Sequence, residues 1–509
     1  MPEHLKSLIV ILCLSSGVFA LARAPACRLA IDHADFTRRR NLWLGITLAA
    51  FVAHNFWLFL VVSSVLLLVA LQREKNALAM FFFLIFAVPP FQTEIPGMGI
   101  INFLMDISYL KLLGLLVLLP TALSLWQRKE DVISGHRAAD WYLAGFLILL
   151  FVLQLTVDTA TNSLRHAVYS FIGAALPYYV ASRLPRNLAA FREVLMAFVI
   201  AAMLLAAIAV FEFAKQWLLY ASLPAALGVH WNLGSYLSRG NFLRSVASTG
   251  HAIALGYVMA VAIGLYLFLQ RSTPRASWYW GFLLLLAGLV TPLSRGPWVG
   301  AAIMFLVFVA TGPRPLRDIG LAVMVGLLAL PILWMSPWGE RMIDFLPFVG
   351  TVDADNVTYR QRLVAVSLDV VAEHPWFGAS DFLLDPRMQQ LVQGEKMIDM
   401  VNSYLDVALS SGLVGLSLLL AFFATVAFGI LREMKYLTDK DSELYLLGRS
   451  LLATLAGILV TISTVGSILA IPVIYWSISG LCIAYARMLA SVRMREMAHR
   501  PVYTMASSN

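Results

Sequence analysis

The chain has 509 residues, of which 60 % are hydrophobic and only 13 % are charged, and its formal net charge is +8. An average globular domain is about half apolar and about a quarter charged, so this composition excludes a soluble enzyme, a disordered tail and a secreted disulfide scaffold. Lys and Arg stand singly or in short groups between apolar runs, where they indicate membrane orientation and not nucleic-acid binding. The sequence therefore predicts an integral membrane protein.

Apolar runs long enough to cross a bilayer follow one another along the chain. Crossing about 30 Å of hydrocarbon takes about 20 apolar residues, and a helix pairs its own N–H and C=O groups. We therefore expect an all-α, polytopic transmembrane helix bundle of about 12–15 spans. The fourteen ranges predicted are 7–23, 42–70, 77–91, 101–124, 140–157, 167–181, 191–213, 247–269, 277–292, 297–312, 319–336, 403–430, 446–466 and 468–488.

The start of the chain leaves two linked alternatives. The first alternative concerns a signal peptide, whose pattern is present in Lys6, the apolar run after it and the small residues 20–22. We expect this segment to be an uncleaved membrane anchor. The range 42–70 is long for one crossing, with His54 and Asn55 at its middle, so it forms either one helix or two short helices that meet at a turn. The arginines at 38–40 favour the cytoplasm, which fits only if this range crosses twice.

Positive charge divides the loops between the spans into two sets. The loops 125–139, 182–190, 270–276, 313–318 and 431–445 and the tail from 487 hold 16 Lys and Arg in 75 residues. The opposite loops, 92–100, 158–166, 214–246, 293–296 and 337–402, hold ten in 121 residues. Since cytoplasmic loops carry the excess of Lys and Arg, we expect the first set and the C-terminus in the cytoplasm of a bacterial inner membrane. The two largest loops would then be periplasmic.

The range 337–402 differs in composition from the rest, because ten of the 29 acids gather there beside five bases. We interpret it as a folded periplasmic loop insert with an amphipathic helix at 358–374, which ends at His374-Pro375. Its apolar stripe would be Leu363, Val366, Val370 and Val371. We divide the chain into an N-terminal anchor with the first spans (1–76), a transmembrane core (77–336), the insert (337–402), C-terminal spans (403–489) and a cytoplasmic tail (490–509).

Four arginines, Arg244, Arg295, Arg360 and Arg362, are predicted outside the membrane or at its outer boundary. Arginine near hydrocarbon is costly unless paired, and its guanidinium fork binds phosphate oxygens bidentately. The start of the 358–374 helix would add backbone N–H donors for an anion. A lipid-linked diphosphate fits these groups. Pairing with lipid head groups or with the acids of the insert is the alternative for any one of the arginines.

Several of these elements resemble, in order and spacing, the O-antigen ligase and polymerase superfamily. They are Arg244 with His251, the turn Ser294-Arg295-Gly296, Arg360 followed by Glu373-His374-Pro375-Trp376-Phe377-Gly378, and Asn402 followed by Gly412-Leu413-Val414-Gly415. The resemblance covers roughly residues 77–488, and its last two elements are the most specific.

The resemblance implies a bacterial inner-membrane glycosyltransferase that uses a polyprenyl-diphosphate-linked glycan on the periplasmic face, without nucleotide sugar, cofactor or metal. Arg244 and Arg295 match the arginines that hold the donor diphosphate, and Arg360 matches the arginine that opens the loop helix. The expected partners are membrane lipid, the lipid-linked oligosaccharide and a glycan acceptor, with a flippase and a chain-length regulator as further candidates and no nucleic acid.

One position departs from the ligase pattern, because Val401 occupies the place of the histidine that the resemblance identifies as the ligase base. This favours a polymerase of surface polysaccharide, O-antigen or exopolysaccharide over a ligase that transfers glycan to lipid or to a protein hydroxyl. A base must then come from elsewhere, and the candidates are His374, whose ordinary pKa suits the task, then Glu373 and Asp399. The alternative for His374 is that it caps the last carbonyls of the helix, and for Glu373 and Asp399 it is a solvated surface position.

For four other residues, the sequence allows either a role in substrate binding or an ordinary structural role. His251 lines a donor channel or is a packed, hydrogen-bonded histidine, and Asn402 and Tyr404 bind sugar hydroxyls or serve the helix end and the aromatic belt. Trp298 stacks on a sugar or is an interfacial tryptophan.

A small-anion transporter, for bicarbonate for example, is the alternative of a different functional class. The basic cluster is expected at one surface, however, whereas transporters place such groups near the bilayer midplane.

Overall fold

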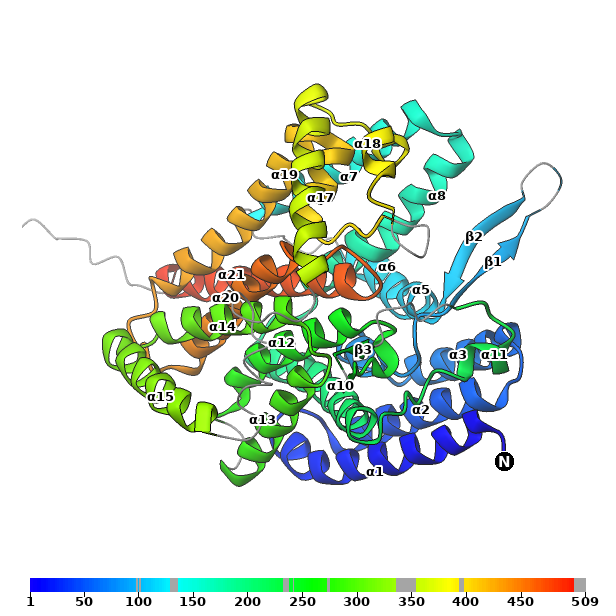
Figure 1. Ribbon diagram of the computed structural model, residues 1–509. Coiled ribbons are helices and arrows are strands. Elements are labelled where there is room, and N and C mark those ends of the chain that lie inside the picture. Colours follow the sequence, from blue (N-terminus) through cyan, green and yellow to red (C-terminus); the bar gives the residue numbers. More distant parts are fainter. Residues whose placement is uncertain are drawn as a thin grey trace, which may run out of the picture.

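The computed structural model describes residues 1–97, 99, 102–128, 136–231, 238–240, 242–271, 275–335, 354–392 and 398–498. Over these residues the protein is a bundle of helices with two short antiparallel strand pairs (Figure 1). The α-helices are α1 (Glu3–Leu29), α2 (His33–Val52), α3 (Phe56–Leu71), α4 (Ala77–Leu84), α5 (Tyr109–Leu113), α6 (Leu119–Gln127), α7 (Ala138–Val157), α8 (Ala160–Ser170), α9 (Leu176–Ala181), α10 (Leu188–Lys215), α11 (Leu223–Leu227), α12 (Ala252–Leu269), α13 (Arg275–Val290), α14 (Arg295–Ala310), α15 (Pro315–Met335), α17 (Ala354–Glu373), α18 (Pro386–Gln389), α19 (Ser403–Met434), α20 (Glu443–Ile462) and α21 (Ile471–Ala498). Strands β1 (Gln92–Pro96) and β2 (Phe103–Ser108) pair, as do β3 (Ser238–Arg239) and β4 (Phe242–Leu243); η1 (Gly114–Leu118) and η3 (Phe171–Ala175) are π-helical turns, and η4 (Ala247–Thr249) and η5 (Phe382–Leu384) are 3₁₀ turns.

Eight helical segments in the described ranges are long and apolar enough to cross a membrane: Glu3–Leu29, Tyr109–Gln127, Ala138–Val157, Leu188–Lys215, Ala252–Leu269, Ser403–Met434, Glu443–Ile462 and Ile471–Met494. Helices α3, α13 and α14 are apolar but shorter. These helices confirm the all-α, multi-pass membrane bundle. Their number is below the expected 12–15, because some predicted ranges are divided; the range 77–91, for example, begins with the eight-residue α4 and leaves the helix after Leu84.

The long apolar range 42–70 forms two helices. Helix α2 ends at Val52, His54 has a positive φ of 52°, and the Asn55 side chain caps α3 by accepting the N–H groups of Trp57 and Leu58. The two helices run back along each other, so the end of α3 returns to the start of α2. There Glu74 accepts hydrogen bonds from Arg38 (2.7 Å) and Arg39 (2.6 Å). The two-helix alternative is therefore the one that the structure adopts.

The predicted span 101–124 is wrong in its first third. Residues 103–108 form strand β2, which pairs with β1 in a hairpin that projects from the bundle (Figure 1). Arg165 of α8 donates to the backbone carbonyls of Phe103 and Leu104, and the backbone N–H of Asp106 donates to the Tyr169 hydroxyl. These side chains satisfy polar backbone groups that a helix would have paired internally. Asp106 is consequently outside a spanning helix.

Contacts between loops fall within the two sets that the charge count separated. Arg271 pairs with Asp441, which joins the loops 270–276 and 431–445. At the opposite end, Arg239 donates to the Leu293 carbonyl and so joins the loops 214–246 and 293–296. Each of these two contacts joins loops of the same set, and the side of the membrane on which each set lies stays a prediction.

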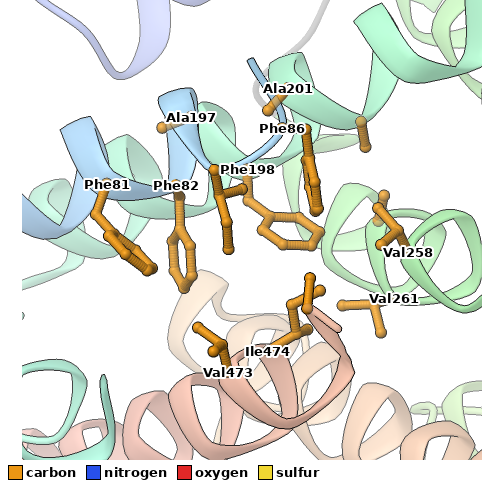
Figure 2. Packing of buried hydrophobic residues seen from close by; sticks show 14 of the residues in the cluster. Phe81, Phe82, Phe86, Ala197, Phe198, Ala201, Val258, Val261, Val473 and Ile474 are labelled. Atoms are coloured by element: carbon orange, nitrogen blue, oxygen red, sulfur yellow. The ribbon is translucent and has the colours of Figure 1, made fainter. Parts of the chain in front are cut away.

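The centre of the bundle is built from helices that are far apart in the sequence. Figure 2 shows side chains of α4, α10, α12 and α21 packed together, with Phe82 and Phe198 in edge-to-face contact at 5.3 Å between ring centroids. Phe82, Phe198 and Val258 are fully buried. Aromatic pairs of this geometry add to the stabilisation from burial alone.

The insert has an apolar cluster of its own. Helix α17 ends at Glu373, and the predicted stripe is confirmed, because Leu363 and Val370 are buried and Val366 and Val371 pack against the same cluster. The other buried members are Phe382, Met388, Leu391, Val401 and Leu409. The acids Glu340, Asp344, Asp353 and Glu395 of the predicted acidic group lie outside the described residues. Helix α17 lies beside α19, and α18 lies beside α17 (Figure 1).

Candidate functional site

The turn between α13 and α14 is the centre of the candidate site. Arg244 is 7 % exposed, and its guanidinium donates to the Pro292 carbonyl (3.0 Å) and to the Ser294 hydroxyl (2.9 Å). The next residue, Arg295, is half-buried and opens α14. The structure therefore brings Arg244 and Arg295, 51 positions apart, to one turn.

A further arginine that the sequence analysis did not single out belongs to the same turn. The β3–β4 pair sets Arg239 opposite Phe242, and the Arg239 guanidinium donates to the carbonyl of Leu293. Leu293 itself has a positive φ of 51°. Strain of this kind in a residue other than glycine is typical of functional sites. The signal in the sequence was weak: Arg239 lies in the same outer loop as Arg244, but in no motif.

A buried carboxylate fixes the segment that carries Arg244. Glu212, near the end of α10, accepts the backbone N–H groups of Leu219 (3.0 Å), Val246 (3.0 Å) and Ala247 (2.8 Å). Ala247 also has a positive φ, of 48°. Sequence reasoning missed Glu212 as well, although a single acid in an apolar span is the signal that could have found it. Its role here is to position the Arg244 segment.

Arg360 lies toward the same group of arginines from the insert. Burial lowers the pKa of the Arg360 guanidinium, while the charge of Asp399 raises it and the charge of Arg239 lowers it further, so both groups are within electrostatic range. The Tyr359 hydroxyl donates to the backbone carbonyl of Asp399 and ties this segment to α17 (3.1 Å). Arg362 is two residues further along α17, about 200° around the helix, and is exposed. Arg360 therefore lies near Arg239 and Asp399, whereas Arg362 is on another face of α17.

Two of the candidate bases occupy a different environment. Glu373 is exposed and receives a bidentate hydrogen bond from Arg387, with distances of 2.8 and 2.7 Å. This interaction holds the pKa of the Glu373 carboxyl below its usual range. His374 is exposed directly after α17, and its described hydrogen bonds are backbone bonds to Val370 and Gly378. The structure does not bring either side chain into described contact with the arginine group.

The two most specific motifs of the resemblance contact each other. Helix α19 is broken at Gly412, with φ 64° and ψ −166°. The freed N–H of Leu413 donates to the Pro375 carbonyl (2.8 Å), and the N–H of Val414 donates to the Trp376 carbonyl. A Cβ at Gly412 would lie 2.3 Å from the Trp376 carbonyl oxygen, so only glycine fits. The motifs at 373–378 and 412–415 thus dock the insert onto α19.

The remaining predicted binding residues have structural contacts. Asn402 caps α19 by accepting the N–H groups of Tyr404 and Leu405, and the Tyr404 hydroxyl donates to the Leu459 carbonyl. The Trp298 indole donates to the Leu289 carbonyl (2.8 Å). These contacts satisfy the polar atoms locally, as expected for caps and interfacial aromatic residues.

His251 and Val401 complete the surroundings of the site. His251 caps α12 through its Nδ1, which accepts the Ile253 N–H, and it lies within electrostatic range of Arg244. Val401, at the position of the ligase histidine, is 9 % exposed and belongs to the apolar cluster of the insert. No proton acceptor occupies that position in this chain.

Comparison with known proteins identifies the region that contains these motifs. Residues 280–420 match the family described as O-antigen ligase, and no curated protein matches the chain. The matched range includes Arg295, Arg360, the 373–378 motif and Gly412-Leu413-Val414-Gly415. It supports a membrane glycosyltransferase of the ligase and polymerase type, with a lipid-linked glycan as substrate. This match over residues 280–420 supports the resemblance of the chain to the O-antigen ligase and polymerase superfamily.

Proposed function

We propose that this protein is a polymerase that joins polyprenyl-diphosphate-linked glycan repeat units at the periplasmic face of a bacterial inner membrane, with its C-terminus in the cytoplasm. The donor's prenyl tail would lie among the helices and its diphosphate at the arginine group. The product would be a longer surface polysaccharide chain and polyprenyl diphosphate. No metal or cofactor enters this mechanism.

The observation that carries the proposal is the convergence of arginines from three segments of chain. Arg239 and Arg244 both donate to the turn that ends in Arg295, and Arg360 lies within electrostatic range of Arg239. Cleavage of the glycosyl–phosphate bond leaves negative charge on the departing diphosphate. Guanidinium groups fixed in a poorly hydrated site stabilise that charge without reorganising during the reaction. A planar guanidinium can also donate two parallel hydrogen bonds to two oxygens of one phosphate.

The position of Val401 supports polymerase over the ligase mechanism that uses a histidine there. Valine offers no lone pair to an acceptor hydroxyl, and its side chain packs in the apolar cluster of the insert. The family match favours a ligase as the second candidate, since its description is O-antigen ligase. The product separates the two: a polymerase yields a ladder of lengthened glycans, whereas a ligase yields one glycan on a lipid or protein acceptor.

The test uses the full chain in lipid nanodiscs with a polyprenyl-diphosphate oligosaccharide. We expect lengthened glycans from the wild type and a loss of at least about 100-fold in turnover for Arg295→Ala, since removing one stabilising donor typically costs 10²–10³. Arg295→Lys should restore only part of it, because lysine lacks the fork. The control is Arg314→Ala, at an exposed arginine before α15. Bicarbonate flux without any glycan transfer would overturn the proposal in favour of a transporter.

A further inference from the structure

A cavity of about 460 Å³ lies among η1, η3, α7, α19 and α21. A smaller cavity of about 160 Å³ adjoins it, and the two share Leu147, Leu150, Ser170 and Ser410 in their walls. The smaller one is also lined by Ser380 of the insert, whose hydroxyl donates to the Ser410 carbonyl (3.2 Å). The two spaces together extend from the docked insert into the bundle. Their volume is in the range typical of small-molecule sites.

The wall of the larger cavity holds a carboxylate that its surroundings do not explain. Asp406 lies in the first turns of α19 and lines the cavity. Across the described part of the chain, no side chain or backbone group donates a hydrogen bond to its carboxylate, and no cation pairs with it. An ionisable group inside an apolar bundle is costly, and such residues usually mark a substrate path. The carboxylate therefore has its full acceptor capacity available to a ligand.

The other polar groups of the cavity suit a hydroxyl-rich ligand. Tyr475, whose hydroxyl is 3.4 Å from that of Ser467, lines the same space, as do Gln92 and Trp476. Lys111 also lines it, and its ammonium donates to the Asp106 carbonyl (3.0 Å) and lies over the Tyr169 ring. Carboxylate, amide and hydroxyl groups bind the hydroxyls of a sugar, and aromatic rings cover its apolar face. A prenyl or acyl chain would use none of these polar groups. The lining therefore favours a saccharide.

The backbone around the cavity is irregular where regular helix would be expected. Both π-helical turns of the described chain contribute to the wall, η1 through Gly114 and η3 through Gly173. Single π turns within helices occur frequently at functional sites. Leu469, on the opposite wall, has a positive φ of 53°. These features indicate a shaped site and not a packing defect.

The cavity and the arginine site have neighbouring residues in common. Pro90 and Leu469 line the cavity, and the same two side chains lie 3.5 and 3.6 Å from the position of a Cβ at Gly250, next to His251, with Trp231 nearer at 3.1 Å. The α20–α21 connection that contains Leu469 also contains Thr464, whose hydroxyl would be 2.3 Å from a Cβ at Gly296, the neighbour of Arg295. One short segment thus borders both the Asp406 cavity and the glycines beside His251 and Arg295.

From this arrangement we infer that the cavity binds the terminal sugar of the acceptor glycan, and that Asp406 is the base for its hydroxyl. The inference rests on the proposed function. The acceptor O–H transfers its proton to the Asp406 carboxylate while its oxygen forms a bond to the anomeric carbon of the donor. The bond from that carbon to the diphosphate oxygen breaks, and the electron pair leaves with the diphosphate at the arginines. Solvent later takes the proton from Asp406.

The first experiment replaces the carboxylate by an amide of the same shape. In full-length protein in nanodiscs, Asp406→Asn should lower kcat by about 10²- to 10⁴-fold, the usual contribution of a positioned base, and leave the donor KM near its wild-type value. Asp406→Glu should recover part of the loss. The matched control is Asp369→Asn, at an exposed carboxylate of α17. Wild-type kcat in Asp406→Asn, with Arg295→Ala inactive, would overturn the inference and leave the proposed function standing.

The second experiment fills the cavity without touching Asp406. A Cβ at Gly173 meets no atom within 4 Å, so Gly173→Leu should fold and project its side chain into the space. Saturation-transfer NMR with free acceptor oligosaccharide should detect binding to the wild type and to Gly17→Leu, a control at an exposed, unobstructed glycine of α1. The signal should be lost in Gly173→Leu. This measurement needs no turnover, so an inactive wild type would refute the polymerase and still leave the cavity testable. An equal signal in all three proteins would refute the sugar site.

Discussion

Two carboxylates in the apolar interior, Glu212 and Asp406, differ in the hydrogen bonds that they accept. In the region of Arg244, Glu212 is 1 % exposed and both of its oxygens accept backbone N–H groups, three in all. In the region of the cavity, Asp406 lines open space and, over the described residues, accepts no hydrogen bond through its side chain. The connection that contains Leu469 borders the cavity and also contacts Gly250, next to His251.

The difference separates a structural carboxylate from a functional one. Glu212 uses its acceptor capacity on the protein, and the benefit is a fixed path for the strained segment around Ala247. An unused acceptor inside a bundle gains nothing for stability, because the ion has lost its water without gaining partners. Asp406 is therefore explained by a ligand, and Glu212 is explained by the fold.

The largest effect is expected from removing the structural carboxylate. Glu212→Ala leaves three buried N–H groups without an acceptor, at about 1–3 kcal/mol each, and should prevent stable folding. Glu212→Gln keeps one acceptor oxygen and should fold with a lower Tm and weakened activity, because the Arg244 segment shifts. Scanning fluorimetry in detergent measures the change. Asp406→Asn is the matched comparison and should keep the wild-type Tm. If Asp406→Asn were the less stable of the two amide variants, the contrast would be reversed.

A smaller but still large effect is expected where the insert docks. The φ and ψ of Gly412 fall in a region that is essentially restricted to glycine, and a Cβ there would overlap the Trp376 carbonyl. Gly412→Ala should cost about 1–3 kcal/mol from the backbone alone and detach the 375–380 segment from α19. Because Ser380 lines the smaller cavity, acceptor KM should rise more than donor KM.

The control for this variant is Gly320→Ala in α15, where an added Cβ meets no atom. It should match the wild type in Tm and in both KM values. Parallel increases of donor and acceptor KM in Gly412→Ala would show that the docking serves the whole site and not the acceptor side.

The sequence predicted most of what depends on local pattern. The apolar stripe of α17, the stop at His374-Pro375 and the turn that ends in Arg295 follow from periodicity and from breaker residues. The resemblance selected Arg244, Arg295 and Arg360, and their role in binding a diphosphate stays a prediction. Hydropathy failed at residues 103–108, where an apolar run is a strand, because the partners that satisfy its backbone come from α8, some 60 positions away.

The parts that the sequence did not reveal depend on distant contacts. Nothing local distinguishes Asp406 from a helix-start acid, since its exposure to a cavity is created by α7, α21 and the π turns. Glu373 had the opposite problem: its sequence neighbourhood suggested a base, yet Arg387, 14 positions on, occupies both of its oxygens. The catalytic role of a carboxylate depends on which groups contact it, and the fold determines those contacts.

The smallest effect is expected for this third carboxylate, which is neither buried nor free. The hydrogen bonds from Arg387 lower the pKa of Glu373, so the pair stabilises the folded state above the unfolded pKa of about 4.3 and loses that contribution as the pH falls through the lower, folded value. Glu373→Gln should therefore have a slightly lower Tm than the wild type at pH 7, and the difference should vanish under strongly acidic conditions. Turnover should stay within about twofold of the wild type, as for a surface substitution, against the loss of orders of magnitude expected for Asp406→Asn. If Glu373→Gln were the inactive variant, the proton acceptor would lie on the insert, and the cavity carboxylate would need another explanation.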